Sequence, residues 1–250
     1  MITQSIQKAA NELREGNLVA IPTETVYGLA ANIFDEQAVQ KIFTVKRRPL
    51  VNPLIVHVRS VYEIDRLAKD VPDVAYTLAR ETWPGPVTLV LPKKDVVPDI
   101  VTGGRPTVAL RMPAHPLTLE LLHHLDFPLA APSANPFGTI SPTKAKHVHN
   151  YFPFGMHILD GGDCERGIES TIIGFEEGQP VLYRPGAASV DVLEKIVGKM
   201  RYPPSAHKEI LSPGMFPKHY SPATPMVPFP HVTAPTSVAV PLSQFVLGTT

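Results

Sequence analysis

Apolar residues recur along this chain with two spacings, one typical of amphipathic helices and the other of buried strands. Apolar positions three and four residues apart predict helices over 6–13, 35–48, 60–68, 74–79, 117–122 and 189–198. Short apolar runs bounded by proline, glycine or polar residues predict strands over 18–21, 53–58, 87–91, 107–112, 156–160, 170–175 and 180–184. Asp35 is expected to cap the second helix, and Ser60 with Glu63 forms a capping-box pattern before the third.

The order of these elements indicates the fold class. Strands and helices interleave without strict alternation, and several strands are only a turn apart. A regular doubly wound fold needs a helix between successive parallel strands. The pattern therefore predicts a mixed α/β sheet.

Proline divides the chain into two regions. Of the 250 residues, 28 are proline, and ten of these follow residue 200. The last 32 residues, from His219 on, contain no Asp, Glu, Lys or Arg. Because proline interrupts this region every few residues, it cannot form a membrane helix. We expect a folded domain over residues 1 to about 200, followed by a linker or tail.

Charge and cysteine content exclude several classes of protein. Lys plus Arg and Asp plus Glu both total 23, so the net charge argues against nucleic-acid binding by bulk charge. Cys164 is the only cysteine, which excludes a disulfide framework. The ten histidines show no metal-ligand spacing, and the N-terminus lacks the apolar core of a signal peptide. We therefore expect a soluble cytoplasmic protein without protein metal ligands.

Two segments near the N-terminus combine polar residues with conformational constraint, one after a predicted strand and one between a predicted helix and a predicted strand. In IPTETVYGL, the residues Thr23, Glu24 and Thr25 come directly after a strand, where α/β proteins often place ligands. A helix N-cap at Thr23 or Thr25 is the alternative. In KRRPLVNPLIVHV (46–58), a proline-stiffened basic loop can hold phosphate. Here the alternative is a set of cations that complements a helix C-terminus.

The strand that follows the basic loop places His57 on one face with Ile55, opposite Leu54, Val56 and Val58. A half-buried structural histidine is the alternative to a ligand-binding one.

Three later segments also place polar residues next to predicted strands. APSAN (131–135) presents Ser133 and Asn135 in a tight loop, either to a ligand or in an Asx turn. In GIESTIIGF (167–175), Ser170 opens a strand after a glycine-rich turn, and in LYRPGA (182–187), Arg184 ends one.

Together these segments resemble the YrdC-like family, the threonylcarbamoyl-AMP synthases. The family's hallmark is a K-x-R, here Lys46 and Arg48, paired with a later S-x-N, here Ser133 and Asn135. The matching stretches run in the family's order across residues 1 to about 200: IPTETVYGLA, the K-x-R, NPLIVHV, WPGPVTLVL, TVALRMPAHP, APSANPFG, ESTII and LYRPGA.

The resemblance implies an open, twisted sheet with helices and a large concave, positively charged cavity. It implies a nucleotidyltransferase that joins L-threonine, bicarbonate and ATP into threonylcarbamoyl-adenylate and pyrophosphate. Partner proteins then use the product to modify the adenosine next to the anticodon of certain tRNAs. Mg²⁺ is expected to accompany ATP, held mainly by phosphate and water.

The resemblance also implies roles for individual residues. Lys46 and Arg48 are the expected catalytic residues and bind the phosphates of ATP. The other expected ATP-binding residues are Asn52, Thr107, Ser133, Asn135, Ser141, Arg184 and Tyr220. The expected threonine-binding residues are Thr25, His57, Arg111, Ala131 and Ser170. Arg111 is expected to pair bidentately with the threonine carboxylate.

The segment SPGMFPKHYSP (212–222) resembles the linker of longer family members, which folds over the mouth of the active site. A second, Rossmann-like domain follows in those members, whereas about 28 residues follow here, too few for such a domain. The expected division is a catalytic domain over 1–200, a linker over 201–222 and a tail over 223–250. A natural short form and a truncated long form both agree with it.

Two rival functions remain at this stage. One is a carbamoyl-adenylate-forming carbamoyltransferase of hydrogenase maturation, whose family members carry cysteine-rich zinc fingers upstream of this domain. The other is a non-catalytic module that binds RNA weakly through a locally basic concave surface. The single cysteine weighs against the first and the zero net charge against the second.

Overall fold

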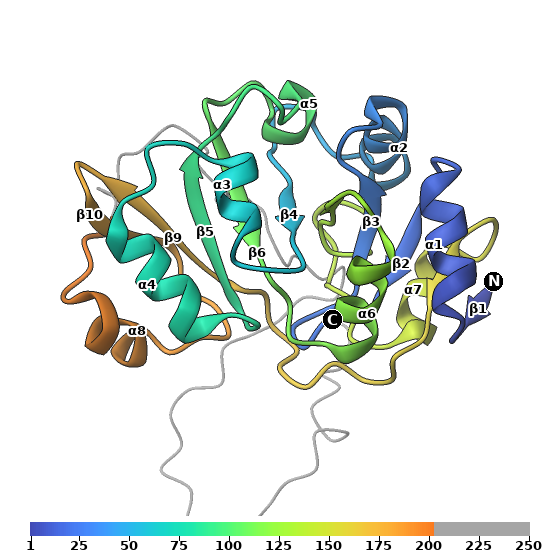
Figure 1. Ribbon diagram of the computed structural model, residues 1–250. Coiled ribbons are helices and arrows are strands. Elements are labelled where there is room, and N and C mark those ends of the chain that lie inside the picture. The colour runs from blue at the N-terminus through green and yellow to red at the C-terminus, as the bar shows by residue number, and fades with distance from the viewer. Residues whose placement is uncertain (203–250) are drawn as a thin grey trace, which may run out of the picture.

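The computed structural model describes residues 1–202, which fold around one sheet of ten strands (Figure 1). The strand order is β1-β8-β2-β3-β7-β4-β6-β5-β9-β10. The strands are β1 (Ile2–Thr3), β2 (Val19–Ile21), β3 (Gly28–Asn32), β4 (Ile55–His57), β5 (Val87–Pro92), β6 (Thr107–Arg111), β7 (Leu129–Ala130), β8 (His157–Leu159), β9 (Thr171–Glu176) and β10 (Gln179–Arg184). The helices are α1 (Ile6–Arg14), α2 (Glu36–Lys46), α3 (Glu63–Leu67), α4 (Asp73–Thr82), α5 (Asp99–Thr102), α6 (Pro116–His124), α7 (Ala145–Tyr151) and α8 (Val190–Val197).

The prediction of a mixed sheet is confirmed. Strands β4 and β6 pair in parallel, as do β5 and β9, whereas β5 with β6 and β9 with β10 are antiparallel. Each predicted strand has its counterpart, with ends that differ by up to two residues. The β4–β6 and β5–β9 pairs bring together segments that are far apart in sequence, and these pairs place the functional site.

Strand β3 does not appear among the predicted strands. Its sequence GLAAN consists of small residues with weak strand propensity. It becomes a strand because it pairs with β2 on one side and with β7 on the other. No helix follows Thr23 and Thr25, so the interpretation of these residues as helix N-caps is wrong.

Of the two helix caps predicted from the sequence, one is confirmed and one is wrong. Asp35 caps α2 by accepting a hydrogen bond from the Ala38 backbone N–H at 3.0 Å. The capping box at Ser60 is wrong, because α3 begins later, at Glu63, and has no side-chain cap. The Glu63 carboxylate instead lies 3.7 Å from the guanidinium of Arg59.

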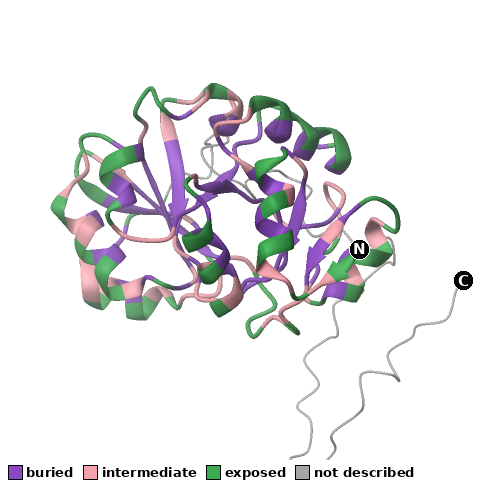
Figure 2. Ribbon diagram, turned by 45° about the vertical axis from the view of Figure 1, so that its right-hand side comes forward, coloured by how far each residue is buried: buried purple, intermediate pink, exposed green. Residues whose placement is uncertain are grey.

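Helices cover both faces of the half of the sheet that contains β2 and β3, and one face of the half that contains β4, β5 and β9. Apolar residues of α1 and α6 pack on one face of β2, β3 and β8, and those of α4 and α8 belong to the main core with β5 and β9 (Figure 1). The buried positions follow the strands through the centre, and the exposed ones lie on the outer helix faces (Figure 2).

The other face of the second half carries a small apolar group of Ile55, Val90, Ala109 and Ile172. As predicted, Ile55 lies opposite Leu54, Val56 and Val58, which belong to the main core. The polar residues that continue this face, among them His57 and Arg111, reach the site described below.

Candidate functional site

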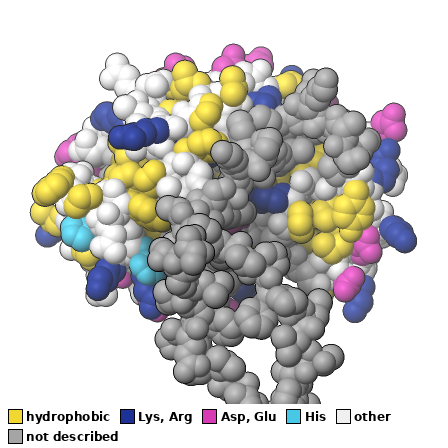
Figure 3. Space-filling model, turned by 180° about the vertical axis from the view of Figure 1, so that it is seen from behind, with side chains coloured by type: hydrophobic (Ala, Val, Ile, Leu, Met, Phe, Trp, Pro, Cys, Tyr) yellow, Lys and Arg dark blue, Asp and Glu magenta, His cyan; other side chains and the backbone are white. Residues whose placement is uncertain are grey.

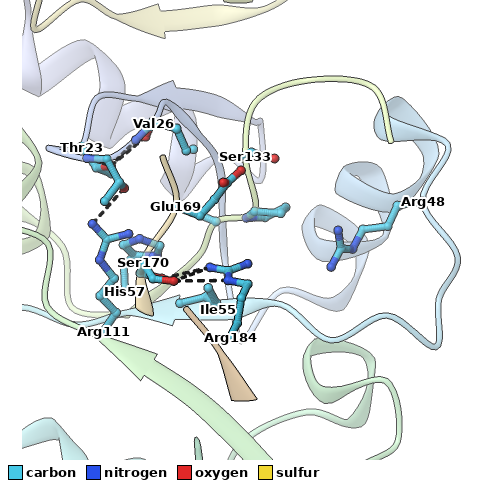
Figure 4. A pocket seen from close by; sticks show the side chains of 14 residues that line it. Thr23, Val26, Arg48, Ile55, His57, Arg111, Ser133, Glu169, Ser170 and Arg184 are labelled. Atoms are coloured by element: carbon cyan, nitrogen blue, oxygen red, sulfur yellow. Dashed lines mark hydrogen bonds between the residues drawn. The ribbon is translucent and has the colours of Figure 1, made fainter. Parts of the chain in front are cut away.

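A pocket lies where β4, β6 and β10 end and β9 begins. Parallel pairing sets His57 directly opposite Arg111. Eight of the predicted site residues line this pocket: Thr25, Arg48, His57, Arg111, Ala131, Ser133, Ser170 and Arg184. Figure 4 shows Arg111, His57 and Thr23 on one side and Arg48 on the opposite side, with Ser170 and Arg184 between them. We call these sides the Arg111 end and the Arg48 end.

Arg111 is fixed by three acceptor residues on two segments of the chain. Its Nε donates to the Gly85 carbonyl at 3.2 Å, and its Nη2 donates to Thr25 Oγ1 at 3.0 Å. Nη2 also lies 2.7 Å from Glu24 Oε1 in an ion pair with both side chains buried. The edge formed by Nε and Nη2 is therefore occupied by protein acceptors.

His57 lies beside Arg111 as a neutral imidazole. Burial, together with the charge of Arg111, lowers the pKa of His57 to about 3. Its Nδ1 has no hydrogen-bond partner among the described residues. A buried polar atom without a partner is costly, so a ligand that satisfies it gains binding energy. His57 thus differs from a structural histidine with satisfied nitrogens.

Ser170 and Arg184 connect the two ends of the pocket. Arg184 donates to the Ser170 carbonyl through Nε at 3.2 Å and through Nη2 at 2.8 Å. The Ser170 hydroxyl lies 2.8 Å from Thr88 Oγ1. These contacts orient the hydroxyl and guanidinium groups before a ligand arrives.

The Arg48 end is built on the turn after α2. Arg47 ends the helix in the left-handed conformation, at φ 53°, and this turn directs Arg48 back toward the loop that follows. Arg48 donates to Asn52 Oδ1 at 2.6 Å and to the Pro53 carbonyl at 2.8 Å. Burial and the nearby Arg184 lower the pKa of Arg48 to about 9, so it remains charged at neutral pH.

Lys46 lies behind the pocket rather than on its wall. Its side chain is buried, with 1% exposure, and its ammonium donates to the carbonyls of Ser133 and Asn135. The Lys46 carbonyl accepts from the Phe137 N–H at 2.7 Å. Burial and Arg48 hold the pKa of Lys46 well below its ordinary value. The K-x-R and S-x-N motifs are therefore in direct contact.

The other predicted residues have different places. Asn52 and Asn135 are buried outside the pocket lining. Asn135 closes its own loop by donating to the Thr139 carbonyl at 2.8 Å. Thr107 begins β6, four residues before Arg111, or about 13 Å along an extended strand. Tyr220 and nearly all of the predicted linker and tail lie outside the described residues.

Ser141 lines a second cavity, which shares Glu169 with the first. Its hydroxyl donates to the Glu169 carboxylate. Ile140, Ile168 and Pro185 form apolar walls of this cavity. An apolar slot beside a cationic pocket suits a ligand with a flat apolar part and an anionic part.

The sequence did not assign roles to two acidic residues of the site. Glu24 pairs with Arg111, and Glu169 is the carboxylate among the residues that line the pocket. Each directly precedes a predicted site residue, Thr25 or Ser170. Glu24 follows β2 and Glu169 precedes β9, so an acidic residue beside an apolar strand was the available signal.

No helix within residues 1–202 is both long and apolar enough to cross a membrane. On the part of the rear face that grey atoms leave visible, Lys and Arg side chains are scattered among apolar and acidic ones (Figure 3).

Comparison with known proteins gives relatives along most of the chain. The Sua5/YciO/YrdC family profile, described as telomere recombination, matches residues 11–186. Threonylcarbamoyl-AMP synthase of Pyrococcus abyssi is 48% identical over 227 residues, covering 89% of this chain and 67% of the relative. The Bacillus subtilis protein of the same name is 44% identical, covering 88% of this chain and 65% of the relative.

The crystal structure of P. abyssi Sua5 complexed with L-threonine superposes with a TM-score of 0.82. It is 49% identical, and the match covers 87% of this chain and 65% of that one. The chain thus spans about two thirds of the length of these relatives. The matching profile, the identity and the shared fold together place this chain in the Sua5/YciO/YrdC family.

Proposed function

We propose that this protein is a nucleotidyltransferase that makes threonylcarbamoyl-adenylate and pyrophosphate from L-threonine, bicarbonate and ATP. The observation that carries this proposal is one pocket with two chemically different ends. Arg48 and Arg184 suit phosphate, whereas Arg111, His57 and Thr25 suit a small polar amino acid. The names of the relatives and the threonine-bound structure of one of them agree with it.

The chemistry consists of two bond-forming steps. The free amine of threonine attacks the carbon of bicarbonate, which forms a carbamate and releases water. A carbamate oxygen then attacks the α-phosphorus of ATP, and the bond to pyrophosphate breaks. Neither step needs an enzyme nucleophile, so the protein contributes positioning and charge stabilisation.

The guanidinium groups of Arg48 and Arg184 bind the phosphates of ATP and stabilise the charge of the departing pyrophosphate. Lys46 holds the turn that carries Ser133. The Ile140–Ile168 cavity takes the adenine ring, within reach of Ser141.

The Arg48 end also suits Mg²⁺, which usually takes phosphate oxygens, water and one or two carboxylates as ligands. Glu169 is the residue that would hold the ion. When bound, Mg²⁺ supplies charge neutralisation to the triphosphate.

At the Arg111 end, the carboxylate of threonine accepts from Arg111. Because Nε and Nη2 already serve Gly85, Thr25 and Glu24, the contact is made mainly through Nη1. His57 Nδ1 and the hydroxyls of Thr25 and Ser170 bind the polar groups of the amino acid. Partner proteins that modify tRNA consume the product.

The test is the dependence of pyrophosphate release on each substrate. We expect release from ATP only when threonine and bicarbonate are both present, and serine should support it less well. ATP turnover without either one would contradict the proposal. Salt-dependent RNA binding without ATP turnover would instead indicate an RNA-binding module.

A further inference from the structure

The two ends of the pocket differ in net charge. Arg48 lies at the Arg48 end and Arg184 between the two ends, with Lys46 behind the pocket and Glu169 as the carboxylate among the lining residues. At the Arg111 end, the single guanidinium has its own buried carboxylate partner, Glu24. The Arg48 end therefore keeps a positive charge, whereas the Arg111 end is close to neutral.

The Glu24–Arg111 pair is built into the framework of the fold. The two side chains are 7% and 4% exposed, and Nη2 and Oε1 lie 2.7 Å apart. Glu24 Oε2 accepts from the Ala114 N–H at 3.1 Å, just before α6. The Glu24 carbonyl accepts from the Arg166 N–H at 2.8 Å. Arg111 lines the pocket, but Glu24 lies beside it, so Glu24 acts on a ligand only through Arg111.

The other titratable groups at this end add no charge at neutral pH. Burial and Arg111 keep His57 neutral. Cys164, whose environment includes Glu24 and Arg111, remains a thiol because burial raises its pKa to about 11. The charge that a ligand meets at the Arg111 end is thus set by the Glu24–Arg111 pair.

We infer that Glu24 is a specificity-determining positioning residue, whose carboxylate keeps the Arg111 end neutral so that it accepts a zwitterionic amino acid and rejects phosphate. A threonine zwitterion has no net charge and meets complementary donors and acceptors there. A phosphate dianion gains little from an arginine that is already paired. Without Glu24, Arg111 would be an uncompensated buried cation, which is unfavourable and attracts any anion. This inference rests on the proposed function for the identity of the amino acid.

The experiment compares Glu24→Gln with Glu24→Asp and with the control Glu63→Gln. Glu63 is a similarly buried, ion-paired glutamate outside the pocket lining. Inorganic phosphate and L-threonine are titrated calorimetrically into the full chain, separately and together. In the wild type, Glu24→Asp and Glu63→Gln, phosphate should leave the threonine Kd unchanged. In Glu24→Gln, phosphate should compete with threonine and raise the apparent threonine Kd by about tenfold or more at high phosphate concentration.

Several outcomes would overturn the inference. Competition between phosphate and threonine in the wild type would do so, and this measurement does not depend on the folding of any variant. The inference would also fail if phosphate did not compete with threonine in Glu24→Gln. It would fail as well if phosphate competed with threonine in Glu24→Asp as it does in Glu24→Gln. If threonine does not bind the wild type at all, the proposed function fails instead. Phosphate alone then still tests Glu24, because Glu24→Gln should gain a second phosphate site.

Discussion

The three arginines of the pocket each donate to a backbone carbonyl. Arg111 donates to Gly85, Arg184 to Ser170 and Arg48 to Pro53. Backbone acceptors cannot rotate away, so these side chains are oriented before a ligand binds. Preorganised charge is worth more for catalysis than mobile surface charge, because little reorganisation is needed during the reaction.

Removing a phosphate-binding cation should slow adenylate formation. We expect Arg48→Ala to reduce pyrophosphate release by about tenfold or more, at least about 1.4 kcal/mol of transition-state stabilisation. Lys46→Ala should reduce it similarly by releasing the turn of Ser133, and it should also lower thermal stability because Lys46 is buried. Near-normal turnover in Arg48→Ala would exclude Arg48 from phosphate binding, and near-normal turnover in Lys46→Ala would show that the Ser133 turn does not affect the reaction.

Removing the Arg111 guanidinium should weaken the binding of threonine rather than that of ATP. Arg111→Ala is expected to raise the KM for threonine more than the KM for ATP, since only the amino acid meets that end of the pocket. Steady-state kinetics with each substrate varied in turn measures the two effects. Equal increases in both constants would contradict a role in binding the carboxylate.

At the scale of elements, the turn after β10 folds back over the start of β9. The Ala187 N–H donates to the Glu169 carbonyl at 2.8 Å, and Thr171 Oγ1 donates to the Ala188 carbonyl at 2.8 Å. Gly186 lies against this backbone, and a Cβ there would be 2.4 Å from the carbonyl oxygen of Glu169. The close approach sets the position of Ser170 in the pocket.

Gly186→Ala should therefore displace the start of β9. We expect a loss of about 1–3 kcal/mol in unfolding free energy from overpacking, together with weaker threonine binding. Denaturant unfolding and calorimetry measure the two effects. The matched control is Gly104→Ala, whose Cβ would meet no atom within 4 Å. Its left-handed φ of 77° costs stability, but threonine affinity should be unchanged. Unchanged threonine affinity in Gly186→Ala would refute this role of the turn.

At the scale of the whole molecule, the sheet encloses ionisable groups at the junction of its two halves. His57 is 2% exposed and lies near Arg111, so its protonation competes with folding. Because its pKa is about 3 in the folded protein and about 6.5 when unfolded, the unfolded state binds a proton first as pH falls. Stability contributed by neutral His57 is therefore full above pH 6.5 and decreases toward pH 3.

This linkage predicts a pH-dependent difference between the wild type and His57→Gln. Between pH 6 and pH 4, the wild type should lose up to about 1.4 kcal/mol per pH unit more than the variant. Urea unfolding at several pH values measures it, with the exposed His123→Gln as control. Parallel curves for the wild type and His57→Gln would show that His57 is not buried in its neutral form.

Local sequence patterns were sufficient to predict most helices and strands and to identify most residues of the site. Asp35 and the apolar spacing after it predicted α2, and proline or glycine bounded most strands. The motifs, through their resemblance to a family, identified eight residues that line one pocket. Local pattern failed at β3, whose small residues become a strand only between two partners.

The sequence by itself determined the family, the mixed α/β class and the set of polar residues at strand ends, because motif order and periodicity are properties of neighbouring residues. Only the tertiary structure decided which of these residues face one cavity. The pairing of β4 with β6 and of β5 with β9 brings His57, Arg111 and Ser170 together. The same packing buries Lys46 behind the pocket and gives Arg111 its partner Glu24. Such contacts join residues far apart in the chain, so their geometry depends on the whole sheet.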